Sequence, residues 1–370
     1  MHGLRTLVVV AALAALVLVL AAPAMASGGG KGAVFTLTNS ASGNAVAVFD
    51  RTSDGALTPA GTVPTGGNGT GAGLGSQGAI VLDGHRLLAV NAGSNTLSLL
   101  HVNRQGEVSL ADVEPSGGVG PISVTVHGKV VYVVNQGDAT HAANIHGFLA
   151  LWGNLVPLAG SSRLLSTGAP GPAQIEFSPN GKHLVVTEKV TNLIVTYAVG
   201  AGGLAGPPNA QPSAGETPFG FAFDRRSRLI VSEAFGGAPD ASVLSSYSLA
   251  PDGTITPITP NVATTETAAC WVVVTRNGRF TYTTNTGSNS ISGYRIGNDG
   301  GLTLLDSDGV TAATGAGPLD LALARNSRFL YSLNSGAPEI EGFAVNGDGS
   351  LDVLGAVGGL PAGAVGLAAR

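Results

Sequence analysis

The segment TRNGRFTYTTNTGSNSISGYRIGNDGGLTLL at 275–305 decides the fold, because polar turn sequences separate its short apolar runs. RNG, NTGSN and NDGG are the turns. Asn-Gly and Asp-Gly pairs between alternating apolar residues favour β-hairpins, since these residues tolerate positive φ. Together with the apolar run at 271–274, the segment predicts four antiparallel strands at 271–274, 280–284, 291–296 and 302–305. After the N-terminal segment, no stretch shows helical periodicity over a useful length.

The second strand of this unit and the turn after it recur through the chain. Related stretches are GAVFTLTNSASGN at 32–44, HRLLAVNAGSN at 85–95, GKVVYVVNQGD at 128–138, GKHLVVTEKVTN at 181–192, SRLIVSEAFGG at 227–237 and SRFLYSLNSGA at 327–337. Each copy has Asn or Glu at one anchor position, and the anchors are Asn39, Asn91, Asn135, Glu188, Glu233, Asn285 and Asn334. They recur about every 49 residues, so seven units fill the chain.

A single four-stranded unit cannot bury both of its faces, whereas seven units around an axis can. The sequence therefore predicts an all-β, seven-bladed β-propeller of four-stranded antiparallel blades. A parallel β-helix is the competing repeat fold, but its coils are shorter and lack hairpins. The segment PAGAVGLAAR at 361–370 matches the inner strand GPLDLALAR at 317–325. It predicts that the C-terminal strand is innermost in blade one and closes the ring, which hides two sheet edges.

Composition limits the class of protein. Hydrophobic residues make up 44% and charged residues 11%, which excludes disorder, and the net charge of -5 offers no broad basic footprint for nucleic acid. Cys270 is the single cysteine, so internal disulfides and multi-cysteine zinc sites are excluded, and a buried structural thiol is expected.

The N-terminus is typical of a secretory signal peptide. Arg5 precedes an apolar run at 7–22 and the small-residue site Ala24-Met25-Ala26. We therefore predict a signal peptide at 1–26 and a single propeller domain at 27–370, secreted and without a membrane span after cleavage. An uncleaved anchor is the alternative, but the run is short for a span. A monomer is expected.

The stretches FSPNGKHLVV at 177–186, YTTNTGSNSISGYRIGNDGGLTLL at 282–305 and FLYSLNSG at 329–336 resemble the lactonase-family β-propellers, the group of bacterial 6-phosphogluconolactonase and fungal carboxy-cis,cis-muconate cyclase. The resemblance covers nearly all of the mature chain. It implies lactone hydrolysis or formation without a metal or organic cofactor. In that family an inner strand beginning Gly-Pro-Arg-His carries a catalytic Arg and His, and a Glu after the second strand completes the group. In GPAQIEF at 171–177 of this chain, Ala173 and Gln174 replace the Arg and His, and only Glu188 is retained.

The first residues of the inner strands are expected to face the mouth of the central channel. By the repeat they are Ala364, Ala79, Ser123, Gln174, Gly220, Trp271 and Asp320. Four of these can bind or stack against a ligand, namely Ser123, Gln174, Trp271 and Asp320. They predict a small-molecule site, because ligand pockets combine apolar walls with a few convergent polar groups. A water-filled channel is the alternative.

Glu188 and Glu233 are the acidic anchors, and they belong to neighbouring units. Two carboxylates aimed at one mouth would raise the pKa of one of them and supply a general base, so both are predicted catalytic residues. The alternative is that each closes a turn, as Asn does at the other anchors. His141 and His146 share the loop QGDATHAANIHG at 136–147, where two ligands do not make a metal site. They are exposed loop histidines or a substitute for the missing catalytic His.

Two function classes follow. One is a lactonase-like hydrolase or cyclase with Glu188 as its base. The other is a non-catalytic secreted propeller that binds a small molecule, a glycan or a protein partner. Convergence of Glu188, Glu233 and Gln174 on one pocket would favour the enzyme.

Overall fold

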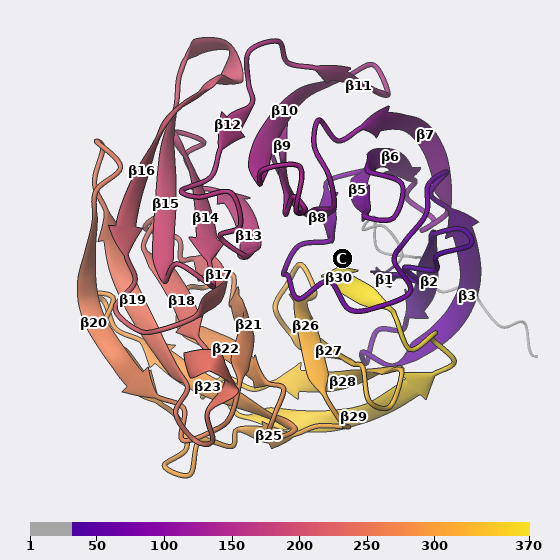
Figure 1. The fold of residues 1–370 in the computed structure, drawn as a ribbon. Coiled ribbons are helices and arrows are strands. Elements are labelled where there is room, and N and C mark those ends of the chain that lie inside the picture. The colour runs from indigo at the N-terminus through magenta and orange to yellow at the C-terminus, as the bar shows by residue number, and fades with distance from the viewer. Residues whose placement is uncertain (1–31) are drawn as a thin grey trace, which may run out of the picture.

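The computed structural model describes residues 32–370 and shows a seven-bladed β-propeller of antiparallel sheets, which confirms the predicted fold class. Figure 1 shows the seven sheets arranged in a ring, with the chain passing from blade to blade. The signal peptide predicted at 1–26 lies outside the described residues.

Each blade has four strand positions from the channel to the rim, numbered here from blade one. The inner strands are β30 (Val365–Ala369), β4 (Ile80–Asp83), β8 (Pro121–His127), β13 (Pro172–Phe177), β17 (Pro218–Phe223), β21 (Ala269–Val274) and β26 (Pro318–Leu323). The second strands are β1 (Gly32–Leu37), β5 (Arg86–Asn91), β9 (Val130–Asn135), β14 (His183–Glu188), β18 (Leu229–Glu233), β22 (Phe280–Asn285) and β27 (Phe329–Asn334). The third strands are β2 (Ala45–Arg51), β6 (Thr96–Val102), β10 (Asn144–Leu151), β15 (Leu193–Val199), β19 (Val243–Leu249), β23 (Ser290–Ile296) and β28 (Glu339–Val345). The outer strands are β3 (Leu57–Pro64), β7 (Val108–Pro115), β11 (Asn154–Pro157), β16 (Ala205–Pro212), β20 (Ile255–Ala263), β24 (Leu302–Leu304) and β29 (Leu351–Gly358).

The outer strand is interrupted in blades three and six. There β11 and β24 are short, and the two-residue strands β12 (Arg163–Leu164) and β25 (Ala312–Ala313) pair with the same third strands further along. The fourth strand predicted at 302–305 therefore ends one residue early. Two short 3₁₀ turns, η1 (Ala201–Gly203) and η2 (Phe235–Gly237), complete the regular structure of the described residues.

Neighbouring blades pack through apolar side chains. The second and third strands are buried almost throughout, whereas an outer strand such as β7 is largely exposed. Between blades four and five, for example, Val185 and Ile194 pack against Phe221, Val231 and Tyr247. Because each face of a blade is covered by the next blade, the ring has to close for every sheet to be buried.

Hydroxyl groups also join successive blades. In five places a buried side chain on a second or third strand donates to a glycine carbonyl in the outer turn of the following blade. The pairs are Tyr132–Gly203, Thr196–Gly253, Ser246–Gly300, Tyr282–Gly349 and Tyr331–Gly55, at 2.7 to 2.9 Å. These bonds satisfy polar atoms that would otherwise be buried without partners.

The C-terminal strand closes the ring as predicted. Strand β30 pairs antiparallel with β1, with Val34 opposite Ala369 and Leu37 opposite Val365. Figure 1 shows the yellow β30 beside the indigo β1 at the centre of the ring. The two ends of the described chain therefore share one sheet, and main-chain hydrogen bonds hold the ring closed.

Candidate functional site: a channel closed at one end

One end of the central channel is closed by the segment that leads into blade two. The Gln77 side chain reaches β21 in blade six, where its Nε2 donates to Val272 O at 2.8 Å and its Oε1 accepts from Val272 N at 2.9 Å. The backbone N–H of Gln77 also donates to Ala173 O of blade four at 3.0 Å. The indole Nε1 of Trp271 donates to Ser76 O at 2.8 Å. These bonds tie blades two, four and six together across the axis.

This crossing requires a glycine at the start of β17. A Cβ on Gly220 would lie 2.3 Å from Gln77 Oε1 and 2.5 Å from Cys270 O, so no larger residue fits without movement. The absence of a side chain at this predicted mouth position therefore makes room for the closing segment.

The Gln174 amide joins two inner strands in the same way. Its Nε2 donates to Phe221 O at 2.9 Å, and its Oε1 accepts from Phe221 N at 2.7 Å. Nε2 also donates to Glu176 Oε2 at 2.9 Å. The amide thus occupies the hydrogen-bonding groups of one peptide in blade five and still holds a carboxyl group that lines the channel.

The remainder of the channel is a cavity of about 520 Å³. It runs from Gln77 and Gly78 at the closed end to His127 and Pro179, which are exposed, at the other. It therefore opens on the face where the first and second strands of each blade are joined by turns, which we call the hairpin face. Its apolar walls include Ile80, Val124, Phe177, Leu321 and Leu367.

Two carboxyl groups, those of Glu176 and Asp320, line this cavity, and both have raised pKa values. Burial raises the pKa of Glu176 to about 8. Burial also raises the pKa of Asp320 to about 7, although Asp320 accepts hydrogen bonds from the Gly366 and Gly78 backbone, the former at 2.7 Å, which favour its charged form. Carboxyl groups that are protonated near neutral pH can both donate and accept hydrogen bonds. Perturbed pKa values in a cavity are typical of functional sites.

The structure brings together only part of the predicted binding set. Gln174 and Asp320 line the channel cavity. Trp271 is buried in the closed end, where its ring lies 5.2 Å from that of Phe219. Ser123 is also buried, and its Oγ accepts from Ile175 N at 3.1 Å. Both of these residues support the channel wall and do not line its cavity.

Sequence reasoning missed Gln77 and Glu176. Glu176 lies two residues after Gln174 on β13, and because side chains alternate along a strand, it points to the same side as Gln174. Gln77 precedes its strand, and the repeat alignment carries no signal for it.

The predicted catalytic Glu188 is fully buried and lies at the end of β14. Its Oε1 accepts from Ser166 N at 3.0 Å, and its Oε2 accepts from Ser166 Oγ and from Thr191 Oγ1, the latter at 2.7 Å. The carboxylate therefore fastens the loop before blade four to the turn that follows β14.

Glu233 has the same position in blade five and is also fully buried. Its Oε1 accepts from Ser213 Oγ, Gly215 N and Tyr247 OH at 2.7, 3.1 and 2.7 Å, and its Oε2 accepts from Ser245 Oγ at 2.6 Å. Burial raises the pKa of Glu233, although these four donors oppose the rise.

Glu188 and Glu233 have separate sets of partners, and neither lines the channel cavity with Gln174. The convergence that would favour the enzyme is not found, because each carboxylate is turned into its own blade, where it binds the loop that leads into that blade. Only Glu188 also binds the turn that follows its strand, through Thr191. The expectation of a shared mouth is corrected here. A catalytic role for either residue stays a prediction.

The other candidate side chains lie apart from the channel cavity. His141 is exposed, and its Nδ1 lies 3.0 Å from Asp138 Oδ1, while His146 Nδ1 lies 2.7 Å from Ser162 Oγ. Among residues 32–370 no group of three or more His, Cys, Asp or Glu side chains is arranged to hold a metal ion. Burial raises the pKa of the Cys270 thiol to about 11, as expected for a structural cysteine.

The fold, the closure of the ring and the channel define a seven-bladed propeller whose candidate ligand site lies on the axis. The sequence matches the family described as lactonase, 7-bladed beta-propeller, over residues 38–146, 157–234 and 243–362. The chain belongs to this family. None of the curated proteins compared with it matches.

Solved structures share the fold at low sequence identity. A candidate 6-phosphogluconolactonase from Bacteroides uniformis has a TM-score of 0.72 and 18% identity, over 90% of this chain and 99% of that one. The periplasmic gluconolactonase of Pseudomonas aeruginosa has a TM-score of 0.68 and 15% identity, over 90% and 98% of the two chains. Within residues 32–370, no helix has the length and apolar character needed to cross a membrane.

Proposed function

We propose that this lactonase-family propeller is an exported protein that binds a small polyhydroxylated acid, or its lactone, in the axial channel. The observation that carries the proposal is the grouping of Gln174, Glu176 and Asp320 in a cavity closed at one end. Sugar hydroxyls both donate and accept hydrogen bonds, and protonated carboxyl groups do the same. The apolar walls suit the C–H faces of a ring or chain. The gluconolactonase of similar fold supports this class of ligand.

Export is supported by the sequence alone. The charged, apolar and small-residue order of 1–26 is that of a cleaved signal. N-terminal sequencing of the protein recovered outside the cytoplasm should begin at Ser27. Recovery of a chain that still begins at Met1 would refute the proposal of cleavage.

Binding is tested by calorimetry with gluconate and glucono-δ-lactone. Glu176→Ala removes a carboxyl group from the cavity, and Glu216→Ala removes an exposed one from the opposite face. We expect Glu176→Ala to weaken binding at least tenfold, the effect of losing about 1.4 kcal/mol, and Glu216→Ala to leave it unchanged. Equal affinities for the parent and Glu176→Ala would place the ligand elsewhere.

Lactone hydrolysis is a second candidate function, and the contact between Gln174 and Glu176 favours it. Once ionised, the Glu176 carboxylate could take a proton from water as the water oxygen attacks the lactone carbonyl carbon. The ring C–O bond then breaks, and the leaving oxygen receives a proton to give the hydroxy acid. Since the pKa of Glu176 is about 8, the rate should rise with pH through that value.

The dependence of the lactone hydrolysis rate on pH distinguishes Glu176 from Glu188 as the general base. Glu176→Gln should abolish the rise of rate with pH, whereas Glu188→Gln should not. The opposite result would assign the chemistry to Glu188 and Glu233. An absence of turnover, with binding retained, would leave the ligand-binding function.

A further inference from the structure

We propose that the hairpin face carries a second site, a cationic groove that binds an acidic polysaccharide through its carboxylates. The groove consists of three adjoining hollows, which we call the arginine groove. It lies outside the channel cavity and rests on observations independent of the function proposed above.

The sequence places arginines in the same turn of three successive blades. The turns joining first to second strands read DRRSR at 224–228, TRNGR at 275–279 and ARNSR at 324–328. In blade six the turn is fixed by Asn277, whose Oδ1 accepts from Thr275 Oγ1 at 2.8 Å and from Arg279 N at 2.9 Å. Gly278 adopts a φ of 69°, which suits glycine. Arg276 is thereby held exposed at the tip of the turn.

The hollows adjoin one another because they share lining residues. The central hollow, of about 760 Å³, lies beside the channel opening and has five arginines in its lining, Arg51, Arg104, Arg276, Arg325 and Arg370. A hollow of about 460 Å³ over blades five to seven shares Arg276 and Asn326 with it and adds Arg225, Arg279 and Arg328.

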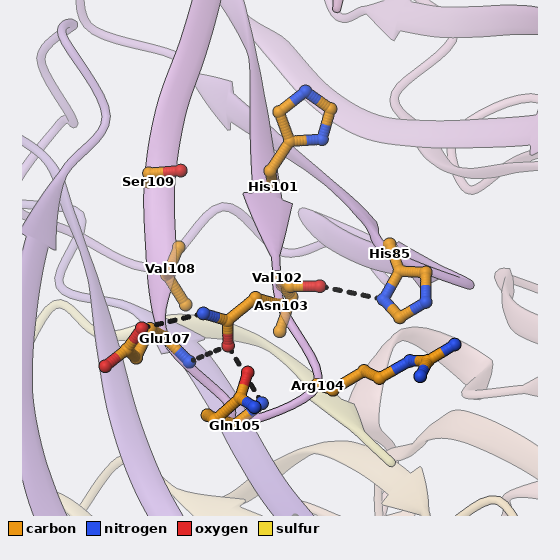
Figure 2. Close-up of a pocket in the computed structure, with 9 residues that line it drawn as sticks. All are labelled: His85, His101, Val102, Asn103, Arg104, Gln105, Glu107, Val108 and Ser109. Carbon is orange, nitrogen blue, oxygen red and sulfur yellow. Dashed lines mark hydrogen bonds between the residues drawn. The ribbon is translucent and has the colours of Figure 1, made fainter. Parts of the chain in front are cut away.

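The third hollow, of about 640 Å³, lies in blade two and shares His85 and Arg104 with the central one. Figure 2 shows the Arg104 side chain extending from the turn on the same side as His85. In the same view Asn103 bonds to Glu107 and Gln105, which fixes the turn that carries Arg104.

The central charges are available to a ligand. Within residues 32–370, no hydrogen bond or ion pair engages the guanidinium groups of Arg104, Arg276 and Arg325, and all three residues are exposed. The acidic residues of the groove are engaged: Asp83 pairs with Arg86, and Glu107 accepts from Asn103 Nδ2 at 2.7 Å. Unpaired guanidinium groups in a hollow favour anions, and their planar fork matches carboxylates.

The remaining lining residues favour a glycan over other polyanions. Asn277, Asn326 and Ser327 offer amide and hydroxyl groups to sugar hydroxyls. Phe280 is the aromatic residue of that hollow, and it is buried, so it provides no surface on which nucleic acid bases could stack. The large apolar residues exposed elsewhere on the described protein, such as Trp152, do not line the groove, which disfavours insertion into lipid. A chain of three hollows suits a polymer better than a single anion.

The test measures binding of oligogalacturonate to the full-length mature protein. The variant Arg276→Gln/Arg325→Gln removes two unpaired charges, and Lys129→Gln/Lys182→Gln removes two exposed charges of the same face that do not line the groove. We expect the arginine variant to bind oligogalacturonate at least tenfold more weakly than the parent, and the affinity of the lysine control to stay within twofold of the parent's. Added salt should weaken binding of oligogalacturonate by the parent, because it screens the charges. Melting temperatures confirm that both variants are folded.

Three results would overturn the proposal. The first is unchanged affinity in the arginine variant. The second is equal binding of neutral dextran by the parent, which would remove the role of carboxylates. The third is tighter binding of single-stranded DNA than of oligogalacturonate at equal charge, which would show that the groove recognises phosphate polymers.

Discussion

Replacing Glu176 by glutamine should stabilise the protein at high pH. Burial in the channel moves the pKa of this carboxyl from its ordinary 4.5 to about 8. Because the folded state holds the proton more tightly, its stability falls as pH rises from about 4.5 through 8. The introduced amide stays neutral at every pH, and its oxygen can still accept from Gln174 Nε2.

The magnitude follows from the two pKa values. Each pKa unit corresponds to about 1.36 kcal/mol, so ionising Glu176 in the folded state costs at most about 5 kcal/mol. Water entering the open end of the channel reduces this cost. We therefore expect Glu176→Gln to gain about 2 kcal/mol over the parent at pH 9 and nothing at pH 4.

The assay is urea unfolding of parent and variant at pH 4, 6, 7.5 and 9. Glu216→Gln is the matched control, since it makes the same chemical change at an exposed position. The difference between Glu176→Gln and the parent should grow with pH, while the control should show no such trend. A difference that stays constant with pH, or a variant less stable than the parent at pH 9, would refute the burial of an ionisable group in the channel.

Three further predictions concern the closure of the ring, the contacts of Glu188 and the hydrogen bonds between blades. Removal of 363–370 should open the ring and cause aggregation or loss of cooperative melting, because β1 loses its inner partner β30 and keeps only β2; a protein that is monomeric by light scattering and melts like the parent in calorimetry would contradict the closure. Glu188→Gln should lower the free energy of unfolding by about 1–3 kcal/mol, since an NH₂ donor would replace the oxygen that accepts from the Ser166 and Thr191 hydroxyls, and leave gluconate affinity unchanged; lost lactone turnover without lost stability would instead support catalysis. Tyr331→Phe should lower the free energy of unfolding in urea by about 1 kcal/mol, because it removes the hydrogen bond to Gly55 O. Tyr197→Phe should leave the free energy of unfolding unchanged, since the buried Tyr197 hydroxyl has no hydrogen-bond partner in the described structure. Equal losses in the two variants would show that the hydroxyl bonds between blades do not stabilise the fold.

The fold could be predicted from sequence because its determinants are local and repeated. Asn-Gly and Asp-Gly turns between strands of alternating apolar residues define one blade. The anchor residue recurs once in each blade, so the number of anchors gives the number of blades. Even the non-local pairing of β30 with β1 could be predicted, since 361–370 repeats an inner strand that lacks its second strand. The short outer strands of blades three and six could not, because the turns within them depend on contacts such as Thr311 Oγ1 with Gly293 N.

The site could be predicted only in part, because residue type does not show which way a hydrogen-bonding group turns. Gln174 and Asp320 were placed by strand position and do line the channel. Glu188 and Glu233 were chosen for their acidity, yet serine, threonine and tyrosine hydroxyls bind their carboxylates inside the blades. Gln77 acts through a bond to another blade 195 residues away, which no local pattern encodes.

The most direct test of the central claim is a crystal structure of the protein grown with saturating gluconate. We predict ligand density in the axial channel, within hydrogen-bond distance of Glu176 and Asp320, with the bonds of Glu188 to Ser166 and Thr191 unchanged. An empty channel with gluconate bound at Glu188 would contradict the claim and restore the site first predicted from the sequence.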